Sequence, residues 1–86
     1  MARVRILTRP GCHLCDDARA VIERVCRDLG VEWEEQSIAG DPELERRYGD
    51  EIPVTFVDGE THDFWRVDEA RLRKALSPKR SLFRRG

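Results

Sequence analysis

The sequence has no hydrophobic run approaching the roughly 20 residues that a membrane-spanning helix requires. Residues 1–5 lead into an alternating pattern instead of the apolar stretch of a secretory signal peptide, so we expect a cytoplasmic protein. No charge of one sign dominates, because 16 basic and 17 acidic residues leave a net charge of −1. This balance argues against a nucleic-acid-binding surface. We therefore expect neither nucleic acid nor a membrane as a partner.

Cysteine is scarce and odd in number, since three residues cannot build the disulfide framework of a small secreted protein. Eighty-six residues suffice for one small domain with a single modest core. We expect this domain to cover residues 1–78 and to be a monomer. Residues 79–86 hold four basic residues. We interpret them as a basic C-terminal tail, which is more typical of a solvated terminus than of a docking arm.

Two of the cysteines are three residues apart, between a predicted strand at 3–8 and a predicted helix at 14–29. At this spacing Cys12 falls at the start of the helix and Cys15 lies on its first turn, so a reversible disulfide between them is sterically possible. The unpaired N–H groups and the positive dipole end of a helix start favour a thiolate over a thiol. The pattern therefore predicts a redox-active pair in which Cys12 is the nucleophile.

Charged neighbours of the pair act in opposite directions. Arg9 and a protonated His13 are expected to stabilise the Cys12 thiolate, together with the helix start. Asp16 and Asp17 in the first helical turn oppose them. We expect the stabilising influence to prevail.

Hydrophobic periodicity and turn residues predict the element order β-α-β-α-β-β-α, an α/β fold. Gly30 provides a stop for the first helix, and Asp41 followed by proline marks the start of the second. Asp58 followed by glycine is a strong hairpin signal between the last two strands. The predicted elements cover residues 3–8, 14–29, 31–38, 42–48, 52–57, 60–65 and 69–76.

Two stretches carry a resemblance to a known family. Residues 11–16 read Gly-Cys-x-x-Cys-Asp, and residues 48–54 read Tyr-Gly-x-x-Ile-Pro-Val. With the element order, they make the chain resemble the glutaredoxin-like branch of the thioredoxin-fold superfamily. The resemblance implies a mixed four-stranded sheet flanked by helices and a thiol-disulfide oxidoreductase that reduces protein or small-molecule disulfides. The chemistry would use Cys12 to attack and Cys15 to resolve, passing through a redox-active Cys12–Cys15 disulfide.

The resemblance also implies a substrate-binding surface. Pro53 would follow a cis peptide bond beside the cysteines, and substrates would dock along the backbone of Ile52. Arg9 and His13 would lie next to the reacting sulfur. Glutaredoxins commonly hold the γ-glutamyl end of glutathione after a Gly-Gly pair, where this chain reads Phe-Trp-Arg-Val-Asp, and Asp68 alone matches that pattern. No bound cofactor is implied, and the electron donor is left open between glutathione and a thioredoxin-reductase-type enzyme.

Other interpretations remain open for the same residues. Two thiolates at this spacing also form half of a zinc site. The other half is not evident, because Cys26 lies on the apolar helix face and His62 stands alone on a strand, so we predict no metal ligand within one chain. A two-chain iron-sulfur site and a non-catalytic adaptor remain alternatives. Trp65 either shields the site or, as we favour, fills the core under the last helix, and the core is expected to include Tyr48, Phe56 and Phe64.

Overall fold

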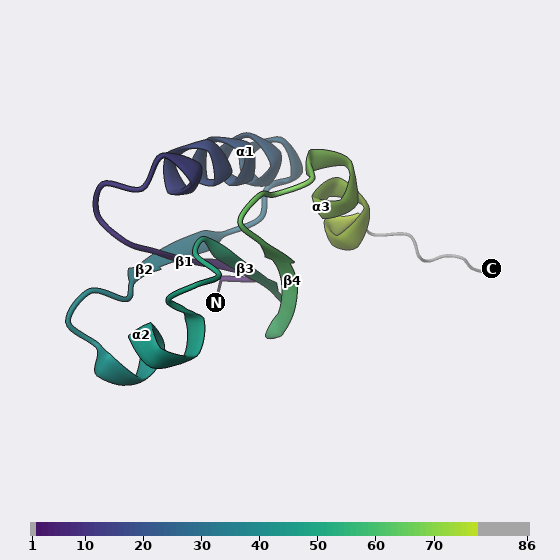
Figure 1. Cartoon of the computed structure of the whole chain (residues 1–86). Helices are drawn as coiled ribbons and strands as arrows, with labels where there is room; N and C mark the ends of the chain where they lie inside the picture. The colour runs from purple at the N-terminus through teal and green to yellow at the C-terminus, as the bar shows by residue number, and fades with distance from the viewer. Residues whose placement is uncertain (1, 78–86) are drawn as a thin grey trace.

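A computed structural model of the protein describes residues 2–77, in which seven elements follow the predicted order β-α-β-α-β-β-α (Figure 1). The predicted tail at 79–86 lies outside the described residues. Within the described part of the chain, no helix has the length and apolar character needed to span a membrane. The elements are β1 (Val4–Thr8), α1 (His13–Leu29), β2 (Trp33–Ser37), α2 (Pro42–Tyr48), β3 (Val54–Val57), β4 (Glu60–Phe64) and α3 (Glu69–Leu76).

The four strands form one mixed sheet, as predicted, and their order in it is β2-β1-β3-β4. β1 pairs parallel with β2 and antiparallel with β3, and β3 pairs antiparallel with β4. The hairpin turn contains Asp58 and Gly59, both with positive φ, which confirms the predicted turn. Helices α1 and α3 cover one face of the sheet, and α2 lies on the other side (Figure 1).

Each face of the sheet contributes to its own core cluster, because side chains alternate along a strand. Under α1 and α3 the cluster contains Val4, Ile6, Ala18, Ile22, Val25, Cys26, Val57, Leu72 and Leu76. A second cluster contains Leu7, Cys15, Ile38, Ile52, Val54 and Phe56, with Cys12, Leu44 and Tyr48 packed against it. The cysteines of the motif therefore rest on the second cluster.

The amphipathic pattern of α1 is confirmed, and its two ends are capped as their residues predict. Cys12 is the N-cap, and Gly30 adopts the left-handed conformation after the last turn. The hydrophobic periodicity of this helix extends to Leu14 and Leu29 and predicts both on its buried face, which is wrong, since they are 37% and 39% exposed. Both lie in terminal turns of the helix, beyond the stripe that packs on the sheet.

The hairpin differs from the expectation at its C-terminal end. β4 stops at Phe64, so Trp65 lies outside the strand. The prediction that these two rings are core residues was wrong, because Phe64 is 39% and Trp65 53% exposed. His62, which stands alone on β4 as the sequence indicates, is half-buried, and burial lowers the pKa of its imidazole. β3 begins at Val54 instead of Ile52, directly after the cis Ile52–Pro53 bond.

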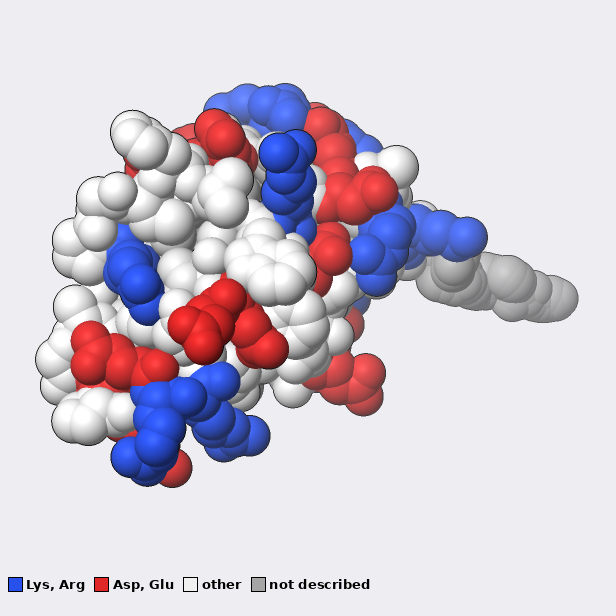
Figure 2. Space-filling model, in the orientation of Figure 1, with Lys and Arg blue, Asp and Glu red and all other residues white. Residues whose placement is uncertain are grey.

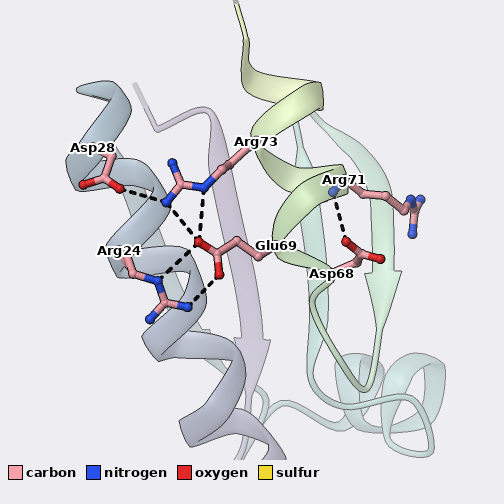
Figure 3. Close-up of polar contacts among 6 residues, drawn as sticks. All are labelled: Arg24, Asp28, Asp68, Glu69, Arg71 and Arg73. Atoms are coloured by element: carbon pink, nitrogen blue, oxygen red, sulfur yellow. Dashed lines mark hydrogen bonds and ion pairs between the residues drawn. The ribbon is translucent and has the colours of Figure 1, made fainter.

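Charged side chains link the two helices on the shared face of the sheet (Figure 3). Glu69 of α3 forms ion pairs with Arg24 of α1 and with Arg73, and Arg73 continues to Asp28 of α1. Hydrogen bonds from the two arginines lower the pKa of Glu69 to about 2. Because these side chains are solvent-accessible, their ion pairs contribute little to the free energy of folding. The main effect of the network is to align α3 along α1.

Candidate active site

The loop after β1 delivers Cys12 to the start of α1. Gly11 has φ of 76°, a left-handed conformation that glycine adopts without strain. Cys12 follows with φ of −97° and ψ of 115°, and its sulfur accepts a hydrogen bond from the backbone N–H of Cys15 at 3.2 Å. The prediction that Cys12 lies just outside the first turn is confirmed. Its half-buried sulfur therefore lies at the positive end of the helix.

Cys15 lies directly beneath this sulfur and is buried. Burial raises the pKa of the Cys15 thiol to about 11, as does its hydrogen bond to Cys12, while the backbone N–H of Arg9 acts in the opposite direction. Cys26 is also buried, which raises the pKa of its thiol, but it belongs to the other core cluster. All three cysteines are free thiols. The motif thus contains one accessible sulfur and one buried sulfur next to it.

This arrangement predicts selective alkylation of the reduced protein. At pH 8, three pH units below the pKa of Cys15, a brief treatment with iodoacetamide should modify Cys12 and leave Cys15 and Cys26 as thiols. Raising the pH should add modification of Cys15, because burial, the largest cause of its raised pKa, keeps this thiol protonated also after Cys12 is modified. Peptide mapping by mass spectrometry measures each site. Equal labelling of Cys12 and Cys26 at pH 8 would contradict the assigned exposures.

Arg9 and His13, expected next to the reacting sulfur, occupy different environments. The Arg9 guanidinium donates a hydrogen bond to the carbonyl of Gly49 at 2.7 Å, which ties the motif loop to the C-terminal end of α2. His13 is exposed on the first turn of α1, and its side chain forms no hydrogen bond or ion pair with residues 2–77. A direct role for either side chain at the sulfur stays a prediction.

The sequence interpretation missed a polar network beside the motif. Arg19 of α1 donates two hydrogen bonds to the carboxylate of Glu35 on β2, at 2.8 and 2.7 Å, and a third to Asp16. Buried Thr8 donates to the same Glu35 carboxylate at 2.8 Å. The network joins the end of β1 to the first turns of α1. Only the Asp16–Arg19 pair had a signal in the sequence, namely its helical spacing of three residues.

The bond between Ile52 and Pro53 is cis, which confirms the prediction. Ile52 belongs to the same core cluster as Cys15, and Cys12 packs against that cluster. The backbone N–H and C=O of Ile52 form no hydrogen bond with the described residues, whereas the Pro53 carbonyl accepts one from the N–H of Trp65 at 2.7 Å. The structure therefore places an unpaired backbone segment beside the motif.

Asp68 lies at the start of α3, where its carboxylate accepts a hydrogen bond from the N–H of Arg71 at 3.0 Å (Figure 3). Its own N–H donates to the carboxylate of Asp63. Both hydrogen bonds cap the helix and neither involves the cysteine motif. Substrate binding by Asp68 stays a prediction.

Among residues 2–77, no group of three or more His, Cys, Asp or Glu side chains is arranged so that it would hold a metal ion. A cysteine pair without further ligands does not complete a four-coordinate site.

The family model of the glutaredoxin-like domain (DUF836) matches residues 3–77, which is nearly the whole chain. The chain belongs to this family. Uncharacterized protein Rv0508 of Mycobacterium tuberculosis is 34% identical to this glutaredoxin-like domain, over 94% of this chain and 87% of its own length. Uncharacterized protein Mb0520 of Mycobacterium bovis has the same identity and coverage.

Solved structures resemble the glutaredoxin-like domain over most of its length. The X-ray structure of protein XcR50 from X. campestris matches with a TM-score of 0.73 and 28% identity, covering 88% of this chain and 97% of XcR50. The solution structure of protein Ne2328 from Nitrosomonas europaea gives 0.75 and 28%, covering 87% and 91%. Fasciola hepatica thioredoxin, at 20% identity, matches with a TM-score of 0.57 over 86% of this chain and 76% of its own. The fold is therefore thioredoxin-like.

Proposed function

We propose that the glutaredoxin-like domain is a thiol-disulfide oxidoreductase that reduces disulfides of proteins or small molecules. The observation that carries the proposal is the hydrogen bond from the Cys15 N–H to the sulfur of Cys12. It holds an accessible sulfur at a helix N-terminus, where a thiolate is stabilised, directly above a second free thiol. A dithiol mechanism requires an accessible attacking sulfur and a second thiol next to it. Cys12 and Cys15, at the start of one helix, are proposed to supply them.

In the proposed reaction the Cys12 thiolate attacks one sulfur of a substrate disulfide. A bond forms between Cys12 and that sulfur, and the other substrate sulfur leaves as a thiolate that takes up a proton. Cys15 then loses its proton and attacks Cys12, which releases the second substrate thiolate. The substrate gains two electrons and becomes two thiols, while the domain becomes a Cys12–Cys15 disulfide. Two electrons from glutathione or from a reductase supplied with NADPH restore the dithiol.

The two cysteines are expected to react in sequence because they influence each other. Negative charge on Cys12 and the hydrogen bond to it are among the causes that raise the pKa of Cys15. Once Cys12 is bound to a substrate sulfur its charge is gone, and these causes disappear with it. Cys15 therefore becomes easier to deprotonate at the step that needs its thiolate.

The unpaired backbone of Ile52 is proposed to receive the substrate as an added extended segment, with Pro53 setting its direction. Arg9 and His13 are proposed to border this contact, and Asp68 to serve substrates that reach the start of α3. We place the reaction in a reducing compartment, the cytoplasm, and assign it to the monomer.

Coupled assays with NADPH test the proposal. The reduced domain is expected to reduce a small disulfide, bis(2-hydroxyethyl) disulfide, or a protein disulfide when it is supplied with glutathione and glutathione reductase or with thioredoxin reductase. Mild oxidation without substrate should give a Cys12–Cys15 disulfide and leave Cys26 as a thiol, which peptide mapping detects. Absence of turnover with both donors, in a protein that still forms this disulfide, would contradict an oxidoreductase function.

A further inference from the structure

Trp65 has an unusual backbone conformation immediately after β4. Its φ is 63°, in the region that bulky residues rarely adopt. The N–H of Arg66 donates to the carbonyl of Phe64 at 2.6 Å, so the chain makes a three-residue turn centred on Trp65. Such γ-turns with positive φ are rare and strained. A strained conformation held by its surroundings is frequent at functional sites.

The surroundings fix the Trp65 side chain without burying it. Its backbone N–H donates to the carbonyl of Pro53, and its indole Nε1–H donates to the carbonyl of Asp50 at 3.0 Å. More than half of the residue nevertheless remains exposed. An aromatic ring that is fixed and exposed offers a large apolar contact at little entropic cost to the protein. The hydrogen bond to Pro53 joins this ring to the loop that borders the redox motif.

A hollow of about 140 Å³ separates Trp65 from the N-terminal half of α1. Its apolar lining consists of Leu14, Ala18 and Val21 on one side and Trp65 and Val67 on the other, and the charged residues Asp17 and Arg66 also line it. Three of the four exposed large hydrophobic residues in the described chain, Leu14, Phe64 and Trp65, lie at this end of the molecule. In Figure 2 a largely uncharged area covers the corresponding end of α1 and the loop before it.

The hollow lies close to the proposed nucleophile. Leu14 is two residues after the proposed nucleophile and in the same helical turn as Cys15. On the other side of the hollow, the backbone N–H of Trp65 is hydrogen-bonded to the carbonyl of Pro53, so the hollow lies next to the proposed substrate contact at Ile52 and Pro53. A polypeptide bound through the Ile52 backbone would carry side chains past Trp65, and a hollow of this size accepts one apolar side chain.

We propose that Leu14 and Trp65 form a docking point for a large apolar side chain next to the substrate cysteine, so that the domain prefers extended protein segments of this kind over glutathione. The inference rests on the proposed function, because it names the substrate class of that site. Glutathione contains no large apolar side chain, and it gains nothing from this contact. Trp65 is thus a specificity-determining residue.

The kinetic test uses two synthetic peptides, each with one intramolecular disulfide, that differ only in Phe or Gly directly before the first cysteine. The wild-type domain should reduce the Phe peptide about 10-fold faster than the Gly peptide or glutathione disulfide. Trp65→Gly should stay folded, because glycine adopts the positive φ of position 65 without strain. This variant should reduce both peptides at the rate at which the wild type reduces the Gly peptide. Trp33→Phe, which changes the other tryptophan, is the control and should keep the preference for the Phe peptide. Leu14→Ser should lose this preference, and it replaces Trp65→Gly as the test variant if Trp65→Gly does not fold.

A binding test does not depend on turnover. In Cys12→Ser combined with Trp33→Phe, Trp65 is the one remaining tryptophan. The Phe peptide should move its fluorescence emission to shorter wavelength as the ring is covered, and the Gly peptide should not. Equal rates for the two peptides in the wild type, an equal slowing of both in Trp65→Gly, or an unchanged emission would each overturn the docking proposal. A shifted emission in the Cys12→Ser variant, together with no reduction of either peptide by the wild type, would support docking and contradict the proposed function instead.

Discussion

Cys12→Ser should lower the rate of disulfide reduction by orders of magnitude, to that of the uncatalysed exchange. The hydroxyl of serine does not ionise at neutral pH, even at the helix N-terminus where the Cys12 sulfur lies. It also remains able to accept the hydrogen bond that caps α1, because serine is a preferred N-cap residue. The variant should therefore lose chemistry and keep its stability. Coupled assays and urea unfolding measure the two properties separately.

Cys15→Ser should have a different effect, because attack by Cys12 does not require the second sulfur. A mixed disulfide between Cys12 and the substrate should accumulate, and mass spectrometry of the protein detects the added mass. Cys26→Ala is the matched control, since it removes a buried cysteine from the other core cluster. It should keep normal turnover at a stability cost on the order of 1 kcal/mol. Equal losses in all three variants, with no adduct, would contradict the assigned roles.

Leu7→Ala should cost about 2–5 kcal/mol of unfolding free energy, a large part of the roughly 5–15 kcal/mol typical of a domain. Leu7 is buried in the centre of the sheet and packs in the cluster that contains Cys15 and Ile52. Removing its side chain leaves a cavity that strand pairing on both sides prevents from closing. Urea unfolding monitored by circular dichroism gives the difference.

Leu29→Ala provides the control for this prediction. The same atoms are removed, but from a residue that is 39% exposed at the end of α1 and belongs to neither core cluster. We expect a cost below about 1 kcal/mol, because little apolar surface is transferred and no cavity forms. Similar costs for the two leucines would show that the cluster around Leu7 is less tightly packed than its burial indicates.

Local signals in the sequence were sufficient to predict the element order and the position of the cysteine pair. Periodicity marked α1, and paired turn residues such as Asp58 and Gly59 marked the hairpin. The position of Cys12 at the helix start followed from its place between strand and helix. These features depend on residues close together in the chain, so physical rules for short segments apply to them.

The features that were missed depend on contacts between distant segments. Glu35 meets Arg19 only because β2 pairs beside β1, and 16 residues separate the two side chains in the sequence. Trp65 was expected in the core because a large apolar residue is usually buried. Its positive φ and its hydrogen bond to Asp50 arise from the way the chain leaves β4. A glycine would have indicated a positive φ at this position, whereas a tryptophan does not. The polar network and the exposed ring therefore required the structure.

In the proposed reaction the sulfur of Cys12 is both the reacting atom and the acceptor that completes the N-terminus of α1. As a thiolate it offers this helix end a full negative charge, whereas in a disulfide it offers a neutral acceptor, and hydrogen bonds to charged groups are roughly twice as strong. Folding and electron uptake form a closed thermodynamic cycle, so helix stabilisation in the reduced form adds an equal driving force for reduction. In the proposed reaction helix α1 is therefore part of the redox couple, because any preference of its N-terminus for a Cys12 thiolate makes the Cys12–Cys15 disulfide of the folded domain a stronger oxidant.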